Sequence, residues 1–276
     1  MSSSDASGIG LLAEGGTRLP GVSSSQTIAT VERAVDVLLL FTRRRGATLG
    51  VTEIANELSM SKAAVHRILS SLRGKGLLDV HEDTRRYSLG PGTLALGLAY
   101  LDKLDVRDLA QNELLLLSDA TNETATLSIR SGTTRTYVSQ RLPDREVKMT
   151  VQLGRPFALH AGSSSKAFLA FLPEAEIDEY LAGPLDALTS TTIVDPDALR
   201  ADLRKIRKVG YALSFGERQA GAGSVAAPVF DHNGRVAAAV SVCGPVERFR
   251  SDVDDTAAIL VASTRRLSAR MGYGAS

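Results

Sequence analysis

The sequence predicts an α+β fold in two domains: a small helical domain that ends in a β-hairpin, and a larger domain of mixed helices and strands. Two observations predict this division. The chain has 276 residues, 43% of them hydrophobic, which is enough for about two cores at roughly 150 residues per domain. The spacing of apolar residues is helical in the first part and becomes mixed beyond residue 105. We therefore expect a flexible tail over 1–25, a first domain over 26–90, a linker helix over 91–104 and a second domain over 105–276.

The first domain is expected to contain three helices followed by two short strands. Apolar residues recur at helical spacing in the first segment, and polar residues in suitable places can cap the next two helices. Gly74 and Gly76 stop the third helix. The predicted elements are a helix over Thr27–Thr42 that Arg43–Gly46 ends, a second helix capped by Thr52, a third from Ser61 to about Arg73, and hairpin strands over Leu77–Val80 and Arg86–Leu89.

The third predicted helix has two chemically different faces. Residues 61–76 include four Lys or Arg residues and no acid, within a stretch, residues 26–104, that has eleven basic and eight acidic residues. Apolar residues at i, i+3, i+4 and i+7 from Val65 to Leu72 define a buried stripe, so the opposite face is small, polar and basic. Such a face fits the major groove of DNA, and the hairpin can reach an adjacent groove, which together indicate a winged helix-turn-helix. The expected DNA contacts are Thr52, Ser61, Lys62, Ala63, His66, Arg67, Ser70, Arg73, Arg85 and Arg86.

The second domain is expected to mix helices and strands. Strict alternation of apolar and polar residues marks its strands, and turn signals such as Asp231–Gly234 separate them. The predicted elements are a helix over Val106–Ala120, strands over Thr124–Ile129, Thr134–Ser139 and Val147–Leu153, helices over Ser163–Leu172 and Glu174–Leu181, a helix that Asp195 and Pro196 start, a hairpin of Ser224–Phe230 and Arg235–Cys243, and a last helix opened by a capping box of Ser251 and Asp254.

Composition excludes several classes of protein. The single cysteine, Cys243, rules out a disulfide framework and a multi-cysteine zinc site, and the four histidines are too scattered for metal-ligand spacing. No apolar run approaches the roughly 20 residues that span a bilayer, and the first 25 residues lack the pattern of a signal peptide. We expect a cytoplasmic protein that uses no metal and no cofactor and binds no membrane.

An enzyme is a weak alternative. Ser163–Lys166 matches the S-x-x-K motif of penicillin-recognising enzymes, but the S-D-N and K-T-G strings that this chemistry also needs do not occur in the sequence. We therefore expect no catalytic residues, although a serine-dependent hydrolase stays open. A constitutive DNA-binding protein whose second domain only oligomerises is the other alternative.

Several segments of the chain resemble the IclR-type transcriptional regulators. They are VTEIANELSMSKAAVHRILSSLRGKGLL (Val51–Leu78), YSLG (Tyr87–Gly90), GRPFALHAGSSSKAFLAFLP (Gly154–Pro173), GYALSFGE (Gly210–Glu217), SVAAPVFD (Ser224–Asp231) and AVSVCGP (Ala239–Pro245). The resemblance covers about residues 26–272. It implies a winged helix-turn-helix domain, a connecting helix and a GAF-like α/β ligand-sensing domain. It also implies a homodimer or tetramer on double-stranded operator DNA, a repressor role, and a small organic or aromatic acid as effector.

A serine-rich helix start is the candidate effector site. Ala161–Ser165 combines a glycine, three serines and the beginning of a helix, which favours a carboxylate without a fully buried arginine. The alternation in Ser241–Cys243 turns both polar residues to one face of a strand. One departure from the family pattern is Ser165, which precedes Lys166 where the family usually has glycine. Carried over by position, the resemblance implies effector contacts from Ser163, Ser164, Ser224, Ser241 and Cys243, with Ser214 or Phe215 on a flanking loop.

Overall fold

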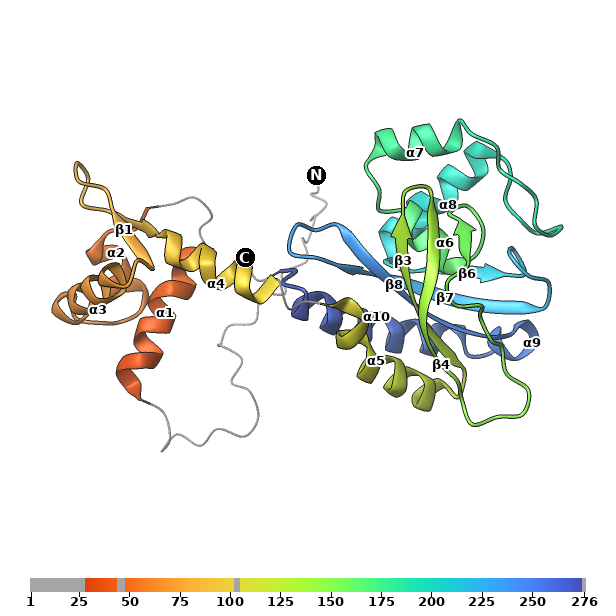
Figure 1. Ribbon diagram of the computed structural model, residues 1–276, viewed down its shortest axis with the longest axis horizontal. Helices are drawn as coiled ribbons and strands as arrows, with labels where there is room; N and C mark the ends of the chain where they lie inside the picture. Colours follow the sequence, from red (N-terminus) through yellow and green to blue (C-terminus); the bar gives the residue numbers. More distant parts are fainter. Residues whose placement is uncertain (1–27, 44–47, 102–104, 275–276) are drawn as a thin grey trace, which may run out of the picture. The chain divides into compact units, whose positions relative to one another are not determined.

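The computed structural model describes residues 28–43, 48–101 and 105–274. These residues form two compact units that divide between Gly97 and Leu98, and Figure 1 shows the elements of each. The predicted flexible tail over 1–25 lies outside the described residues, as do residues 44–47 and the last three residues of the predicted linker helix. In the described ranges, no helix is both long and apolar enough to cross a membrane.

The first unit is a small three-helix domain closed by a two-stranded hairpin. Its core joins Val37 of the first helix, Leu69 of the third helix and Tyr87 of the hairpin. Leu49, just before the second helix, pairs with Tyr87 as an isolated β-bridge and so ties that helix to the hairpin. The elements are α1 (Ala29–Arg43), α2 (Val51–Glu57), α3 (Lys62–Gly74), β1 (Leu78–Val80) and β2 (Tyr87–Leu89), followed by α4 (Pro91–Leu101), which begins in this unit.

Glycines allow the backbone at the start of α4 to pack closely against the end of α3. A Cβ atom on Gly90 would stand 2.6 Å from the carbonyl oxygen of Gly76, and one on Gly92 would stand 2.8 Å from it. Gly76 itself has a φ of 69°, a left-handed backbone that glycine adopts at little cost. These close approaches hold the start of α4 against the end of α3.

The second unit is built on one six-stranded sheet in the order β5-β4-β3-β8-β7-β6, and every neighbouring pair is antiparallel. The order differs from the chain order because β3 pairs with β8 and so brings the two ends of the domain together. The strands are β3 (Thr124–Ser131), β4 (Thr134–Arg141), β5 (Pro156–Ala158), β6 (Ala212–Phe215), β7 (Ala222–Phe230) and β8 (Val236–Pro245). The helices are α5 (Val106–Thr121), α6 (Ser163–Leu169), α7 (Glu174–Leu181), α8 (Pro196–Val209), α9 (Val246–Phe249) and α10 (Val253–Arg270).

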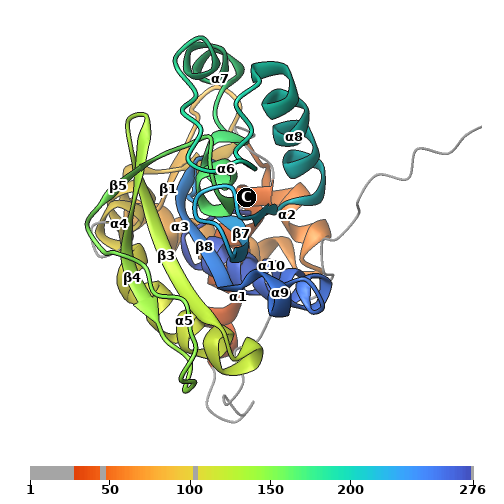
Figure 2. The ribbon, with the colours of Figure 1, turned by 90° about the vertical axis from the view of Figure 1, so that its right-hand side faces the viewer.

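Helices cover both faces of this sheet. Helices α5 and α10 lie on one face, and α6, α7 and α8 lie on the other (Figures 1 and 2). The face toward α5 and α10 carries larger aliphatic side chains such as Leu127 and Val240, whereas the opposite face carries small ones such as Thr126, Ala226 and Ser241. Because these side chains are small, α6 lies close to the sheet and all seven of its residues are buried.

The strand predicted over Val147–Leu153 is wrong. The segment has no strand partner, and the edge of β4 instead pairs with the shorter β5. The side-chain amide of Gln140 takes the place of a strand neighbour: its Oε1 accepts from the Val151 N–H at 3.0 Å and its Nε2 donates to the Val151 carbonyl at 3.2 Å. The alternation of apolar and polar residues therefore predicted a strand in a segment that lies beside the sheet but is not part of it.

Two of the predicted helix caps are confirmed and two are wrong. Ser61 and Asp195 cap α3 and α8 as expected, accepting from backbone N–H groups at 3.2 and 2.7 Å. Thr52 is not the cap of α2, because the helix starts after Gly50. The capping box of Ser251 with Asp254 is also wrong: the last helix starts after Asp252, and the Ser251 hydroxyl donates to the Arg248 carbonyl.

Candidate functional sites

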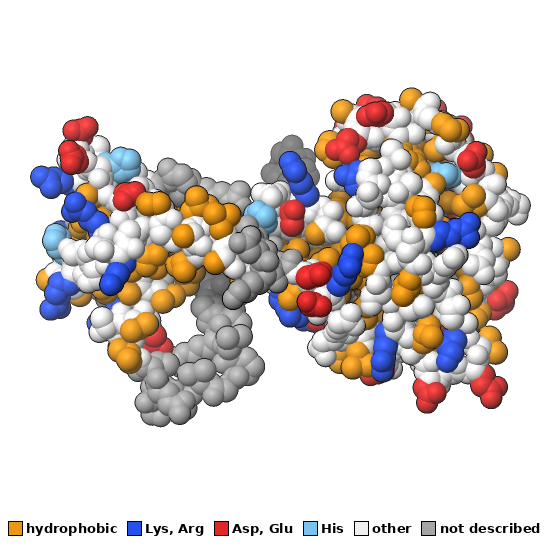
Figure 3. All heavy atoms as spheres, viewed as in Figure 1, with side chains coloured by type: hydrophobic (Ala, Val, Ile, Leu, Met, Phe, Trp, Pro, Cys, Tyr) orange, Lys and Arg blue, Asp and Glu red, His pale blue; other side chains and the backbone are white. Residues whose placement is uncertain are grey.

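The third helix of the first unit presents the predicted polar face to solvent. Val65, Ile68, Leu69 and Leu72 are buried in the core of the unit. The opposite side is exposed, and Figure 3 shows Lys and Arg side chains over this side of the first unit. The exposed predicted contacts on α3 are Lys62, Ala63, His66, Arg67, Ser70 and Arg73. α3 has no acidic residue, so no carboxylate of the helix itself opposes a phosphate.

A hollow separates this face of α3 from the hairpin. It measures about 580 Å³ and is lined by His66, Ser70 and Arg73 from the helix and by Arg85 from the hairpin. Arg85 has a φ of 55°, a left-handed conformation that is unfavourable for a residue with a side chain. This strained turn places the Arg85 side chain at the wall of the hollow. Two acidic residues, Glu82 and Asp83, are exposed in the same turn.

Arg86 and Thr52 take other positions. The Arg86 guanidinium donates to Thr48 Oγ1 at 2.9 Å and to Glu53 Oε2 at 2.7 Å, so it fastens the hairpin to the start of α2. Thr52 is exposed in the first turn of α2. The structure therefore brings Arg85, and not Arg86, to the hollow beside α3.

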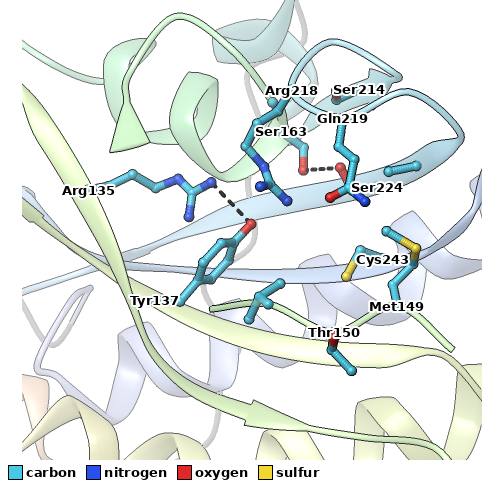
Figure 4. Close-up of a pocket in the computed structure, with 13 residues that line it drawn as sticks. Arg135, Tyr137, Met149, Thr150, Ser163, Ser214, Arg218, Gln219, Ser224 and Cys243 are labelled. Atoms are coloured by element: carbon cyan, nitrogen blue, oxygen red, sulfur yellow. Dashed lines mark hydrogen bonds between the residues drawn. The ribbon is translucent and has the colours of Figure 1, made fainter. Parts of the chain in front are cut away.

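The second unit contains a small cavity on the α6 side of the sheet (Figure 4). The space that the centre of a water molecule can occupy is only about 20 Å³, which is close to the room needed by a single water. Strands β4, β6, β7 and β8, the start of α6, the loop after β6 and the segment before β5 supply its walls. The lining residues are Arg135, Tyr137, Met149, Thr150, Val151, Gly162, Ser163, Ser214, Arg218, Gln219, Ala222, Ser224 and Cys243.

Arg135 is the most unusual lining residue, because it is charged and yet only 1% exposed. Nε donates to Ser165 Oγ at 2.8 Å, Nη1 to Ser128 Oγ at 3.2 Å and Nη2 to Tyr137 Oη at 3.1 Å. Burial lowers the pKa of Arg135, and the nearby Arg218 adds to this effect. Arginine nevertheless stays charged at neutral pH. The cavity therefore contains a fully buried arginine, which the sequence analysis did not require for an anion site at the helix start.

Arg218 brings a second cation to the cavity from the loop after β6. Its guanidinium carbon lies 4.9 Å from the centroid of the Phe157 ring and 5.8 Å from that of Tyr137, and the corresponding distances for Arg135 are 5.0 and 4.0 Å. In Figure 4, Arg135 and Arg218 both extend toward Tyr137. Among the described residues, no carboxylate forms a salt bridge with either guanidinium.

A carboxylate of the chain itself lies at the start of α6. Glu217 Oε2 accepts from the Gly162 N–H at 3.0 Å, and its Oε1 lies 2.5 Å from Nζ of the buried Lys166. Lys166 also bonds Asp202 of α8 at 2.8 Å. A protein carboxylate thus binds one N–H group beside the serines from which we expected effector contacts, and through Lys166 it links the cavity wall to α8.

The predicted effector contacts separate into two groups. Ser163, Ser214, Ser224 and Cys243 line the cavity, and the Ser163 hydroxyl donates to Ser224 Oγ at 2.7 Å. Ser164 and Ser241 do not line it; they are almost fully buried, and Ser241 Oγ lies 2.6 Å from Thr126 Oγ1. Ser214 and Phe215 lie on β6 and not on a loop, which corrects that expectation. Burial raises the pKa of the Cys243 thiol to about 12, so the thiol stays neutral beside the cavity.

Sequence reasoning missed Arg135, Tyr137 and Arg218. A signal for the first two was present, because alternation in Thr134–Ser139 places Arg135 and Tyr137 on the same side of the strand. An arginine on the inward side of a strand requires a partner, since an isolated buried charge is costly. No comparable signal marks Arg218, which reaches the cavity only through the loop after β6.

Comparison with known proteins gives one consistent result. Family models described as "IclR helix-turn-helix domain" and "Bacterial transcriptional regulator IclR C-terminal" match residues 30–81 and 98–269. The HTH-type transcriptional regulator BhcR of Paracoccus denitrificans (strain Pd 1222) is 35% identical over 229 residues, 83% of this chain and 81% of BhcR. The crystal structure of Pseudomonas aeruginosa HmgR matches with a TM-score of 0.78 and 33% identity over 90% of this chain and 100% of that one. An IclR-type regulator from Silicibacter sp. TM1040 matches with a TM-score of 0.81 and 29% identity over 90% and 97%.

Proposed function

The chain belongs to the IclR family of bacterial transcriptional regulators, which have a DNA-binding first part and a ligand-binding second part, and we propose which of its residues bind DNA and which bind the ligand. Residues 26–90 act as the DNA-binding domain, residues 105–276 as the effector-binding domain, and the helix over 91–104 joins them. The exposed face of α3 enters the major groove of operator DNA in the cytoplasm. The cavity that Arg135 lines binds a small organic acid, which changes the affinity for the operator and relieves repression.

One observation carries the DNA-binding part: the exposed side of α3 has cations and small polar residues, and no acid. Arg67, in the middle of this side, can pair with a guanine edge, and Lys62 at the helix start can contact a phosphate. The hollow between α3 and the hairpin, with Arg73 and Arg85 on its walls, suits a phosphate strand beside the occupied groove.

A homodimer follows from the same proposal. One recognition helix binds DNA weakly, and two-fold symmetry supplies the second half-site of an operator. Helix α4 has eleven residues and no charged one, and Leu94, Leu96 and Leu98 on it are at least 50% exposed. An exposed apolar helix of this kind favours burial against another apolar surface, and we propose that α4 of a second copy of the chain packs against it.

The second unit supports binding rather than catalysis. Ser163 donates to Ser224, and Lys166 is held between Glu217 and Asp202 as an ammonium group. A lysine that is paired with two carboxylates does not serve as the general base that an S-x-x-K hydrolase needs. The contacts of these residues therefore favour a regulator that performs no chemistry on its ligand.

Replacement of Arg67 tests the proposed function. With operator DNA selected by the wild-type protein from a random duplex library, Arg67→Ala is expected to cost about 1–3 kcal/mol of binding free energy and to relax the preference at one base position. Lys205→Ala, which removes an exposed cation of α8, is the matched control and is expected to leave binding unchanged. Fluorescence anisotropy measures both affinities, and thermal melting verifies that both variants are folded.

Two results would contradict the proposal. Unchanged operator affinity in a folded Arg67→Ala protein would remove α3 from the DNA interface. Operator affinity that no small organic acid alters would leave the alternative of a constitutive DNA-binding protein with an oligomerising second domain.

A further inference from the structure

The buried guanidinium of Arg135 has unused hydrogen-bonding capacity. An arginine side chain offers five N–H donors, and three of those of Arg135 meet the oxygens of Ser165, Ser128 and Tyr137. The remaining two have no acceptor among the described residues. All three acceptors are neutral hydroxyls, so they hold the guanidinium in place without compensating its charge. A buried charge in this state favours a negatively charged partner from outside the chain.

A second uncompensated cation lines the same cavity. Arg218 is half-buried, forms neither a hydrogen bond nor a salt bridge among the described residues, and contacts the faces of Tyr137 and Phe157. Glu217, the neighbour of Arg218 in the sequence, is engaged by Lys166 and by the Gly162 N–H. The charged residues that line the cavity are thus two arginines and no acid.

Aromatic rings explain how two like charges can stay together. Both guanidinium carbons lie within 6 Å of the Tyr137 and Phe157 ring centroids. Aromatic faces attract cations, and they leave the N–H edges of a guanidinium free to bind other groups. The two arginines also come from different elements, β4 and the loop after β6, so each presents a separate planar fork.

We propose that the effector of this cavity carries two carboxylates, one for Arg135 and one for Arg218. This inference rests on the proposed function, in which the cavity binds an acid, and it narrows the class to short dicarboxylates. Each planar carboxylate accepts two parallel N–H bonds from one guanidinium fork. The cavity has room for about one water as it stands, so it must widen to admit a ligand, and this favours a short one. The hydroxyls of Ser163 and Ser224 in its wall offer further polar contacts.

A series of matched acids tests the proposal on the full-length protein. The probes are the linear dicarboxylates of two to six carbons, each beside its own monoamide, which has the same length and one negative charge fewer. Isothermal titration calorimetry at neutral pH is expected to find at least one dicarboxylate that binds about tenfold or more tightly than its monoamide. Sulfate is the control for an effect of ionic charge alone.

Two variants locate the second carboxylate. Arg218→Gln is expected to reduce the preference for the dicarboxylate over the monoamide to about threefold or less, while the affinity for the monoamide changes little. Arg155→Gln is the matched control, because Arg155 lies 5.6 Å from the Phe157 centroid but does not line the cavity; the preference is expected to persist in this variant. Arg218 is half-exposed, so its replacement leaves the buried Arg135 in place.

The outcomes separate this inference from the proposed function. Equal affinity for a dicarboxylate and its monoamide, or equal binding of sulfate, would overturn the two-carboxylate proposal. If a monoacid nevertheless releases operator DNA, the proposed function still holds. A preference that survives Arg218→Gln would also overturn it, since the second carboxylate would then lie elsewhere. If no acid of the series binds, the inference is wrong, and the operator assays alone decide the proposed function.

Discussion

The face of α3 and the cavity of the second unit both collect cations without acids, yet they differ in burial. Arg67 and Arg73 on α3 are exposed to water, whereas Arg135 in the cavity is 1% exposed. Exposed cations keep their hydration and act together on a large polyanion by releasing its counterions. A buried cation has lost its hydration and interacts strongly with one small anion at short range.

This difference in burial explains how one protein can bind two kinds of anion. A DNA phosphate strand cannot reach Arg135, because this residue is 1% exposed. A small acid gains little from an exposed arginine, because exposed ion pairs contribute at most about 1 kcal/mol. Burial therefore separates the two recognition tasks, although both rely on arginine.

The largest expected difference between the two regions is their response to salt. If a dimer makes about six phosphate contacts through residues such as Lys62, Arg73 and Arg85, operator affinity should fall about 10³-fold between 50 and 200 mM salt. Affinity for the acid in the cavity should change far less, because burial shields Arg135 from salt ions. Titrations of DNA and of ligand over the same salt series measure both slopes. Parallel slopes would remove the distinction between the regions.

Two buried cations within the second unit sharpen the comparison. Lys166→Met leaves the buried Glu217 without its cation and is expected to cost about 3–5 kcal/mol of unfolding free energy. Arg135→Met leaves no unpaired carboxylate behind, because no acid pairs with Arg135 in the described residues. Its unfolding free energy is expected to stay within about 1 kcal/mol of the wild type, while binding of the acid is lost.

Scanning calorimetry of the full chain, with ligand titration on the same samples, measures both quantities. An Arg135→Met protein as unstable as Lys166→Met would show that Arg135 has a structural role. Retained acid binding in a stable Arg135→Met protein would move the effector site away from this arginine.

The smallest expected effect concerns the strained turn of the hairpin. Arg85→Gly removes an unfavourable left-handed conformation and is expected to add up to about 1 kcal/mol of stability. The same change removes a cation beside α3, so the salt dependence of operator binding should weaken by about one phosphate contact per protomer. Arg85→Lys retains both charge and strain and is the matched control. A Gly variant with unchanged salt dependence would place the hairpin away from DNA.

The first unit could be predicted largely from its sequence. The buried stripe from Val65 to Leu72, the cap at Ser61 and the two hairpin strands are confirmed. Each depends on residues a few positions apart, which the 3.6-residue period of a helix or the two-residue period of a strand relates directly. The position of Arg86 was not predictable in this way, since its partners Thr48 and Glu53 lie more than 30 residues earlier.

Four of the six strands of the second unit, β3, β4, β7 and β8, were predicted from the sequence, whereas β5, β6 and most of the site were not. The family resemblance placed Ser163, Ser224 and Cys243 at the cavity, where the structure also has them, but it included Ser164 and Ser241, which are buried elsewhere. Ser165, noted as a departure from the family pattern, holds Arg135 by a hydrogen bond that no local pattern indicates.

The sequence by itself determined the two-domain division, the exposed basic face of α3 and the alternation of the main strands, because each follows from the spacing of neighbouring residues. Only the tertiary structure decided that Arg135 and Arg218 line one cavity and that Glu217 accepts from the Gly162 N–H at the start of α6. The reason is physical: the strand order places β4 and the loop after β6 around α6, although they are far apart in the chain. Which charges become neighbours, and how deeply they are buried, depends on that packing and not on any local period.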